Sequence, residues 1–507
     1  MMKKEHPVFA IAEFTPALEV LPEETLERIN QVKFNALASI EPSKDEIIEN
    51  SKTVDKVIAI VKDALLSNDI PFAFIEPQGS TGTKQTQLSG DSDVDLFIGV
   101  RKKILGKLKN ASRKKQREFL KQTFTDIIQN IIMPSLKKHA DPEKMAFSYA
   151  EHPYLTTILF GREFDIVFCF NLDDQEILEG KIVTAMDRTP FHSKFVRNNL
   201  TLDQRNDVRL LKAFFKANHV YGDKSPVGQM GFIGYCLELL VYHFGTMENV
   251  MVNLEAIPSN PLDYFNREKE VLESMNRFSD DFWIVIDPTD KNRNVGSSMD
   301  PRCFHHGIKK IEEFLKNPAK DYFIQGCLPA PLNDDPHYHA VLSTNQQLVH
   351  YTVVRDKLYR ICNMAKSQLE QEQTGEQKYG PIDFAVVFNH DDSRVALAFY
   401  CARNALSSEY KVFGPKTDDE HDRVENYLKK HPAAKTMPDG TYYHYKSREA
   451  VPFANAILEF LDENNDIKGL ALQEMGEKQQ ADMINPYDPL GRQAIYVLKH
   501  MVQPNLP

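Results

Sequence analysis

Apolar residues recur at helical spacing along the first seventy positions. Between residues 45 and 67 one helical face carries Ile47, Val54, Val57, Ile58, Val61 and Leu65. A shorter helix is expected over residues 24–38, ended by the break at Glu41-Pro42-Ser43. The chain therefore begins with an expected pair of helices.

The pattern then changes to short apolar runs typical of strands. Strands are expected at residues 72–77 and 94–100, separated by a loop rich in Gly, Ser and Thr over residues 79–90. Two more are expected at 154–160 and 163–170, with Gly161-Arg162 as a tight hairpin turn between them. The first third of the chain is thus predicted to be an α/β unit of four or five strands flanked by helices.

Helical patterns return at residues 203–218 and 232–243, and the pattern becomes mixed beyond Pro318. That last region predicts a long helix over 345–369 and two strands over 383–388 and 394–402. No internal repeat is present.

The bulk composition fits a multidomain protein with ordinary cores. The 507 residues suffice for roughly three domains of about 150 residues each. No apolar run of about 18 residues or more occurs, and no long apolar stretch follows the first lysines, so neither a membrane span nor a secretory signal is expected. The six cysteines lie far apart without a CxxC pair, which argues against a zinc ribbon and favours a reducing compartment, by default the cytoplasm.

The net charge of −11 is unusual for a protein that binds nucleic acid, but its distribution is uneven. Between Arg101 and Lys121 ten Lys or Arg residues stand against one acid, Glu118. Two interpretations remain open: the solvated face of a helix, or a phosphate-binding surface.

The residues that carry chemistry begin at Asp93-Val94-Asp95, which enter a predicted strand. Residues two apart on a strand project to the same face, so two carboxylates stand side by side. Hard divalent ions such as Mg²⁺ prefer carboxylate, phosphate and water oxygens. Two such ions about 4 Å apart can activate an attacking hydroxyl and stabilise leaving pyrophosphate. Asp165, within an apolar strand where an unpartnered acid is costly, is the candidate third carboxylate.

A turn at Gly79-Ser80 precedes these carboxylates. Glycine adopts the dihedrals that bring backbone N–H groups close to a triphosphate, and Lys84 would add a positive charge there. Each signal alone is weak, and the alternative is a polar loop beside two surface aspartates. The strand–loop–strand order with a later strand aspartate favours a nucleotidyltransferase.

The stretch Gly79-Ser80…Gly90-Asp91-Ser92-Asp93-Val94-Asp95 resembles the active-site signature of polymerase-beta-like nucleotidyltransferases. Further motifs resemble the archaeal-type (class I) CCA-adding enzymes in order and spacing across residues 79–295. They are the stretches 150–154, 187–192, 208–212 with Tyr221-Gly222, 231–235, 287–288 and 293–295. A fainter likeness continues from Lys411 to Lys446. Where the family often has an arginine in the first loop, this chain has Thr83-Lys84.

The resemblance implies a role for each matching residue. Asp93, Asp95 and Asp165 would bind two Mg²⁺ ions, and Asp165 would also help deprotonate the RNA 3′-hydroxyl. The resemblance further implies that Ser80, Thr189, Lys212 and Tyr221 hold the triphosphate, with His192 by the nucleotide and Arg293 at the incoming base. Glu151 and His152 would lie near the RNA end. Without the family, Tyr221 is equally read as a half-buried aromatic and His192 as a capping side chain.

The resemblance also implies an architecture and a reaction. A polymerase-beta-like catalytic head (44–187) would follow an N-terminal extension (1–43) and precede a helical neck (188–317) and a mixed α/β body and tail that bind tRNA (318–507). The expected reaction adds C, C and A to the 3′ end of tRNA from CTP and ATP, and a homodimer is possible. An oligoadenylate or cyclic-dinucleotide synthase is the alternative, disfavoured because such enzymes usually end after the helical second domain. A catalytically inactive RNA-binding module is disfavoured by the three retained carboxylates.

Overall fold

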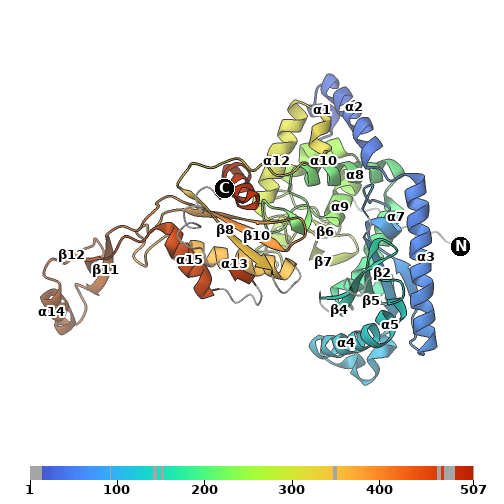
Figure 1. The fold of residues 1–507 in the computed structure, drawn as a ribbon, viewed down its shortest axis with the longest axis horizontal. Helices are drawn as coiled ribbons and strands as arrows, with labels where there is room; N and C mark the ends of the chain where they lie inside the picture. The colour runs from blue at the N-terminus through green and yellow to red at the C-terminus, as the bar shows by residue number, and fades with distance from the viewer. Residues whose placement is uncertain are drawn as a thin grey trace. The chain divides into compact units, whose positions relative to one another are not determined.

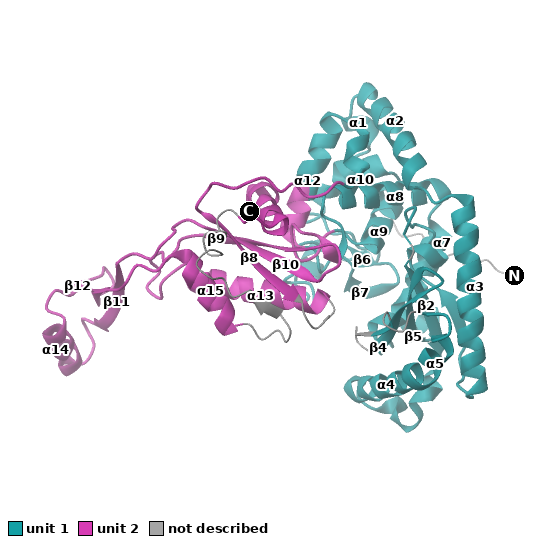
Figure 2. Ribbon diagram, in the orientation of Figure 1, with its two compact units in different colours: residues 1–222, 232–299, 307–325 teal, residues 223–231, 300–306, 326–507 magenta. Residues whose placement is uncertain are grey.

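The computed structural model describes residues 14–91, 93–140, 145–149, 153–345, 351–464, 470–472 and 486–505. The described chain divides into two compact units, shown in Figure 2. Unit 1 holds residues 1–222, 232–299 and 307–325, and unit 2 holds residues 223–231, 300–306 and 326–507. The predicted head and neck regions therefore fall almost wholly in unit 1. No helix among the described residues is long and apolar enough to cross a membrane.

The predicted N-terminal helices are present. They are α2 (Glu23–Ile40) and α3 (Lys44–Ser67), preceded by the short α1 (Ala17–Val20). Ser43 caps α3 by accepting a hydrogen bond from the backbone of Glu46 at 3.1 Å. Pro42 stands in the two-helix junction, where the chain turns because the residue before a proline disfavours helix.

A mixed five-stranded sheet forms the centre of the first part of unit 1 (Figure 1). Its strands, in spatial order, are β1 (Phe74–Pro77), β2 (Val94–Val100), β5 (Arg162–Phe170), β4 (Pro153–Leu159) and β3 (Ala146–Tyr149). β2 and β5 are parallel and the other neighbours are antiparallel. The predicted α/β head with four or five strands is confirmed.

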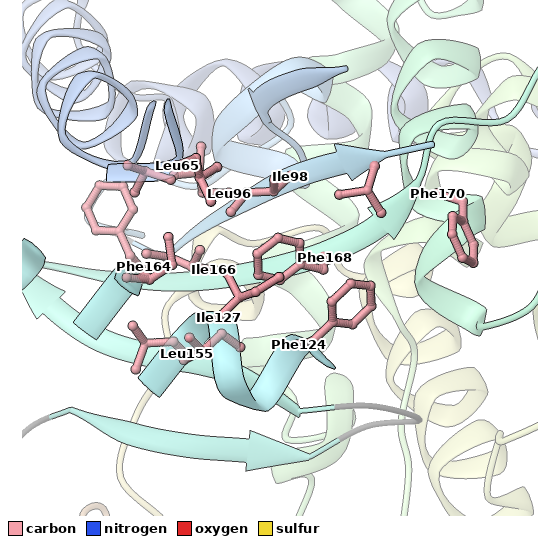
Figure 3. Close-up of a cluster of buried hydrophobic side chains, with 14 of the residues drawn as sticks. Leu65, Leu96, Ile98, Phe124, Ile127, Leu155, Phe164, Ile166, Phe168 and Phe170 are labelled. Atoms are coloured by element: carbon pink, nitrogen blue, oxygen red, sulfur yellow. The ribbon is translucent and has the colours of Figure 1, made fainter. Parts of the chain in front are cut away.

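One face of this sheet packs against helices. Leu96, Ile98, Phe164, Ile166 and Phe168 point into a core that also contains side chains of α3 and α4 (Arg113–Ile127), and the Phe124 ring of α4 stacks on Phe168 with centroids 4.7 Å apart (Figure 3). Because side chains alternate along a strand, Asp95 and Asp165 point to the opposite face. Burial of the apolar alternate positions thus decides which face is left for the carboxylates.

This packing shows on which side of the sheet the basic run lies. Residues 101–121 form a 3₁₀ segment (Lys102–Asn110) and the start of α4, which covers the face opposite the carboxylates. Arg113 and Arg117 donate to the carbonyls of Gly180 (2.6 Å) and Val183 (2.9 Å), and Lys102 pairs with Glu176 at 3.1 Å. The run therefore does not lie beside the carboxylates, because its apolar residues Leu105 and Leu120 pack into the core on the other side of the sheet.

The hairpin between β4 and β5 differs from the prediction by one residue. Phe160 and Gly161 both have positive φ angles, 52° and 79°, and occupy the turn, whereas Arg162 begins β5. A two-residue hairpin turn of this kind needs two left-handed residues, and here a phenylalanine takes the first place.

The remainder of unit 1 is mainly helical. Its helices are α5 (Met133–Leu136), α6 (Asp174–Leu178), α7 (Thr189–Asn199), α8 (Leu202–Ala217), α9 (Gly234–Phe244), α10 (Met247–Asn253) and α11 (Lys269–Glu273). A two-stranded sheet of β6 (Ile286–Asp287) and β7 (Asp290–Asn294) follows, and α12 (Pro301–Lys316) has residues in both units. The two helices expected at 203–218 and 232–243 are confirmed as α8 and α9.

Unit 2 contains a four-stranded sheet with the order β14-β8-β10-β9. Its elements are β8 (Tyr338–Asn345), α13 (Tyr351–Leu369), β9 (Ile382–Phe388), β10 (Arg394–Cys401), α15 (Phe453–Asn464), β14 (Leu470–Leu472) and α17 (Pro489–Val497). The strands expected at 383–388 and 394–402 are confirmed. The helix expected from Asn345 is wrong at its start, since Asn345 belongs to strand β8; the described part of the helix runs over Tyr351–Leu369.

A smaller sheet in unit 2 has the order β11-β13-β12. It consists of β11 (Glu409–Lys416), β12 (Lys435–Thr436) and β13 (Thr441–Ser447), with α14 (His421–Lys430) between β11 and β12. Phe413 and Tyr445 leave 42% and 48% of their surface exposed on it.

Candidate active site

Two of the predicted carboxylates lie on neighbouring strands. Asp95 and Asp165 are register partners in the parallel pair of β2 and β5, so they share one face of the sheet. Asp93 stands two residues before Asp95 and is exposed. The Thr156 hydroxyl on β4 donates to Asp165 Oδ1 at 2.6 Å. The pairing of β2 with β5 therefore brings Asp95 and Asp165 together, although no three acidic, His or Cys side chains of the described residues are already gathered as a metal site.

Burial and neighbouring negative charge both raise the pKa values of Asp95 and Asp165. Burial raises the pKa of Asp95, the charge of Lys84 opposes this, and the charge of Asp93 adds to it. Burial likewise raises the pKa of Asp165 to about 6, with a lowering by the Thr156 hydrogen bond and further raising by Asp95 and Asp93. Partly buried like charges destabilise one another, so this site favours a cation.

Gly79 makes room for Asp95. Its φ is 65°, a left-handed value that favours glycine, and a Cβ added there would lie 2.1 Å from Asp95 Oδ2. Ser80 follows directly and begins a single tight helical turn that ends at Lys84. Gly79-Ser80 therefore turns the chain and allows the Asp95 carboxylate to lie against the main chain.

A buried acid on α9 gathers the candidate phosphate-binding lysines. Glu238 Oε2 accepts from Lys84 Nζ at 2.7 Å, and its Oε1 accepts from the Thr86 hydroxyl at 2.6 Å. Lys212 Nζ of α8 donates to the Thr86 carbonyl at 2.9 Å and lies 3.8 Å from Glu238 Oε1. Removing either partner of such a buried pair leaves an uncompensated charge. Glu238 was not identified from the sequence, although a lone acid within the apolar run of α9 was a signal for a paired buried charge.

Lys212 and Tyr221 meet at the start of α9. A Cβ added to Gly234 would lie 3.1 Å from the Tyr221 hydroxyl oxygen and 3.2 Å from Lys212 Cε, so both side chains reach the same glycine. Burial lowers the pKa of Lys212 to about 8, partly opposed by the charge of Glu238. A hydroxyl and an ammonium group at the N-terminus of a helix form a surface suited to anions.

His192 and Arg293 belong to a second cluster around Asp287. His192 Nε2 lies 2.8 Å from Asp287 Oδ2 and 2.9 Å from Arg293 Nη1, and Arg293 Nη1 lies 3.3 Å from the same Asp287 oxygen. Burial lowers the pKa of His192 to about 4, outweighing Asp287, so the ring is neutral at pH 7. A neutral ring carries one N–H, so Nε2 either donates to Asp287 or accepts from Arg293.

Tyr235 connects the two clusters. Its hydroxyl donates to Asp287 Oδ1 at 3.0 Å, and its ring stacks on His192 with centroids 4.2 Å apart. Lys84 Nζ lies over the same ring at 4.6 Å and Arg293 at 5.8 Å. In the sequence, Tyr235 is only the last residue of the motif at 231–235, because its contacts come from segments far apart in the chain.

The remaining predicted residues are placed as follows. Thr189 is the first residue of α7, one turn before His192. Glu151 and His152 lie outside the described residues. The structure therefore brings Asp95, Asp165, Lys84, Lys212, Tyr221, His192 and Arg293 into unit 1 on connected elements, consistent with one extended site.

Comparison with known proteins finds similar sequences over several parts of the chain. Residues 206–324 match the family model for the second domain of tRNA nucleotidyltransferases. The CCA-adding enzyme of Methanocaldococcus jannaschii is 32% identical over 304 residues, which are 58% of this chain and 61% of that enzyme. The CCA-adding enzyme of Saccharolobus shibatae is 28% identical over 421 residues, which are 81% of this chain and 89% of that enzyme.

The chain spans less than two thirds of the first relatives' length, 61% for the M. jannaschii enzyme. Among solved structures, Cid1 poly(U) polymerase bound to Mg and 3′-dATP superposes with a TM-score of 0.42 and 11% identity, covering 60% of this chain and 99% of that one.

The matched second domain and the mixed sheet with paired aspartates make this chain similar to the nucleotidyltransferase class. Within that class, it is a sequence relative of the archaeal CCA-adding enzymes, which confirms the resemblance predicted from the motifs.

Proposed function

We propose that this protein adds C, C and A to the 3′ end of tRNA without a template, using CTP and ATP and releasing pyrophosphate. The observation that carries the proposal is the pairing of Asp95 with Asp165 on adjacent parallel strands, in a chain whose relatives are named CCA-adding enzymes. The proposed chemistry is attack of the RNA 3′-hydroxyl on the α-phosphate of the nucleotide.

Two Mg²⁺ ions are the proposed cofactor. Asp93, Asp95 and Asp165 would hold them, because carboxylate oxygens are the ligands that Mg²⁺ prefers and Asp95 lies opposite Asp165 on the neighbouring strand. When bound, such ions polarise the phosphate and lower the pKa of the attacking hydroxyl. Asp165 would also help to deprotonate the RNA 3′-hydroxyl, as the resemblance implies.

The nucleotide would lie across the two side-chain clusters. Backbone N–H groups at Gly79-Ser80, together with Thr189, Lys212 and Tyr221, would hold the triphosphate. Lys84 would contribute through its charge, since one of its three donors is already engaged by Glu238. His192 and Arg293 would lie at the base, and Glu151 and His152 would lie near the RNA end.

The tRNA would be bound by residues 318–507, with the predicted domain boundaries at 43/44, 187/188 and 317/318. Support comes from the small sheet of unit 2, where the partly exposed rings of Phe413 and Tyr445 share one face with Lys411, the register partner of Tyr445. This second unit also favours tRNA over the alternative, an oligoadenylate or cyclic-dinucleotide synthase, because such an enzyme needs no RNA-acceptor surface. We propose a cytoplasmic location and leave a homodimer as a possibility that the molar mass in solution would decide.

Incubation with tRNA lacking its CCA end, separately labelled nucleotides and Mg²⁺ tests the proposal. Labelled tRNA supports it, and stepwise omission of ATP or CTP distinguishes full CCA addition from addition of only A or only CC. A small labelled oligonucleotide instead of labelled tRNA would establish the alternative synthase. If the folded protein gives no labelled product, the alternative of a catalytically inactive RNA-binding module is favoured.

A further inference from the structure

The segment that leads to Asp93 is fastened to the junction of the two N-terminal helices. The Ser89 backbone N–H donates to the Ile40 carbonyl, at the end of α2, over 2.7 Å. Glu46, in the first turn of α3, accepts from the Ser89 hydroxyl and from the Gly90 backbone N–H, each at 3.0 Å. Three hydrogen bonds thus connect positions 89–90 with residues more than forty positions earlier.

Glu46 makes these bonds in place of a local one. The sequence Ser43-x-x-Glu46 is a capping-box pattern, in which the glutamate normally reaches back to the backbone N–H of the capping serine. Here Ser43 accepts from the Glu46 backbone as expected, but both Glu46 carboxylate oxygens bind Ser89 and Gly90. Gly90 has a φ of 82°, so this left-handed turn is held by the carboxylate of another element.

The same segment is held from the neck side. Lys216 of α8 pairs with Asp91 Oδ1 at 3.1 Å, while the other Asp91 oxygen accepts from the Leu88 backbone at 3.3 Å. α8 is itself fastened to α2, because Lys33 bridges Asp207 of α8 at 2.6 Å and Glu248 of α10 at 2.7 Å. The helix that carries Lys212 and the segment before Asp93 are therefore both tied to α2, and the segment is also tied to α3.

We propose that Glu46 is a positioning residue for Asp93, and that residues 23–46 form part of the catalytic framework rather than an accessory extension. The inference rests on the proposed metal-binding role of Asp93. Asp93 itself lies before the strand, where main-chain pairing with β5 begins only at Val94. The position of its carboxylate therefore depends on how the preceding turn is held.

The test compares Glu46→Ala and Glu46→Gln with Glu49→Ala, an exposed glutamate one turn further along α3. Binding of Mn²⁺ to the full-length protein, measured by electron paramagnetic resonance without nucleotide, is the first readout. The Mg²⁺ dependence of nucleotide addition is the second, and thermal unfolding checks the fold. Glu46→Ala should weaken Mn²⁺ binding and raise the Mg²⁺ concentration for half-maximal rate roughly 3- to 10-fold, the scale of one or two lost hydrogen bonds. Its rate at saturating Mg²⁺ should be almost unchanged.

Glu46→Gln keeps one acceptor and should lie between Glu46→Ala and the wild type, whereas Glu49→Ala should match the wild type. Equal Mn²⁺ affinity in Glu46→Ala and Glu49→Ala would overturn the positioning role, provided that Asp93→Asn weakens binding. If Asp93→Asn also bound Mn²⁺ like the wild type, the metal role of Asp93, and with it the proposed function, would be the part that fails. A loss of thermal stability in Glu46→Ala with unchanged Mn²⁺ affinity would make Glu46 a purely structural residue.

Discussion

Asp95 lies directly opposite Asp165 in the parallel register of β2 and β5, although seventy positions separate them in the chain. Neighbouring strands run about 4.8 Å apart, so partners on one face have their side chains close together. The neutral Thr156 hydroxyl is bound to Asp165, and Lys84 is the nearest cation acting on Asp95. Two carboxylates in this position repel each other, so a bound cation would stabilise them.

Replacing Asp93, Asp95 or Asp165 with Asn should lower turnover by several orders of magnitude, because each substitution removes a charged metal ligand. Single-turnover nucleotide addition measures the loss, and tRNA affinity, measured by filter binding, should survive. Near-normal turnover in Asp93→Asn would remove Asp93 from the metal site.

In the metal-free protein, Asp165→Asn should increase thermal stability at pH 8 but not at pH 4. The folded pKa of Asp165, about 6, lies above the unfolded value of 3.8, so the unfolded state releases its proton first. Stability is therefore lost as pH rises from about 4 through 6, by at most about 3 kcal/mol. The difference in melting temperature between the variant and the wild type, followed from pH 4 to 8, checks this. A constant difference would mean that Asp165 titrates normally.

The kcat/KM for nucleotide should fall above about pH 8 if Lys212 binds the triphosphate. Its pKa, lowered to about 8 by burial, means that the charged form dominates below that pH and disappears above it. Lys212→Arg keeps its charge to higher pH and should extend the plateau, whatever its absolute rate. Identical alkaline limbs in the two proteins would assign the decline to another group.

Arg293→Ala should reduce the preference for CTP over UTP by about 5- to 150-fold, the range for one well-made pair of base contacts. Cytosine and adenine present a ring-nitrogen acceptor beside an amine donor, and the guanidinium supplies only donors. Asp287 is buried and bound by Tyr235, Thr289 and His192, and Asp290 pairs with Arg188 at 2.7 Å. The acceptor for the amine is thus expected from the RNA. Kinetics with each nucleotide on tRNA ending before its first C check the prediction, and an equal loss for all nucleotides would make Arg293 a clamp or a structural residue.

Neutralising Lys103, Lys107, Lys114 and Lys115 should leave the salt dependence of tRNA binding almost unchanged. Four phosphate contacts would flatten the slope of log K against log salt by roughly 3 to 4. These exposed lysines, however, stand on the elements that cover the face opposite Asp95 and Asp165. A slope reduced by that amount would show that the RNA extends onto this face.

The sequence by itself determined the elements and the three aspartates. Helical spacing predicted α2 and α3, and alternation predicted β2, β4 and β5, because these patterns depend on neighbours a few residues apart. The same local rule predicted Asp93 and Asp95 on one side of a strand; Asp95 lies on β2, whereas Asp93 lies just before it. The local rule was less accurate where local signals compete. The hairpin turn lies at Phe160-Gly161 rather than at Gly161-Arg162, and Asn345 ends a strand rather than starting a helix.

Only the tertiary structure decided which face each element presents and which charges meet. The sequence of the basic run at 101–121 did not indicate which face of the sheet it covers, because the face depends on which apolar residues of α4 fill the core. Glu238 meets Lys84 across 154 positions, and Glu46 meets Gly90 across 44. Such pairs form because a buried or bridging charge is stable only beside its partner, and the partner is brought there by the packing of whole helices and strands.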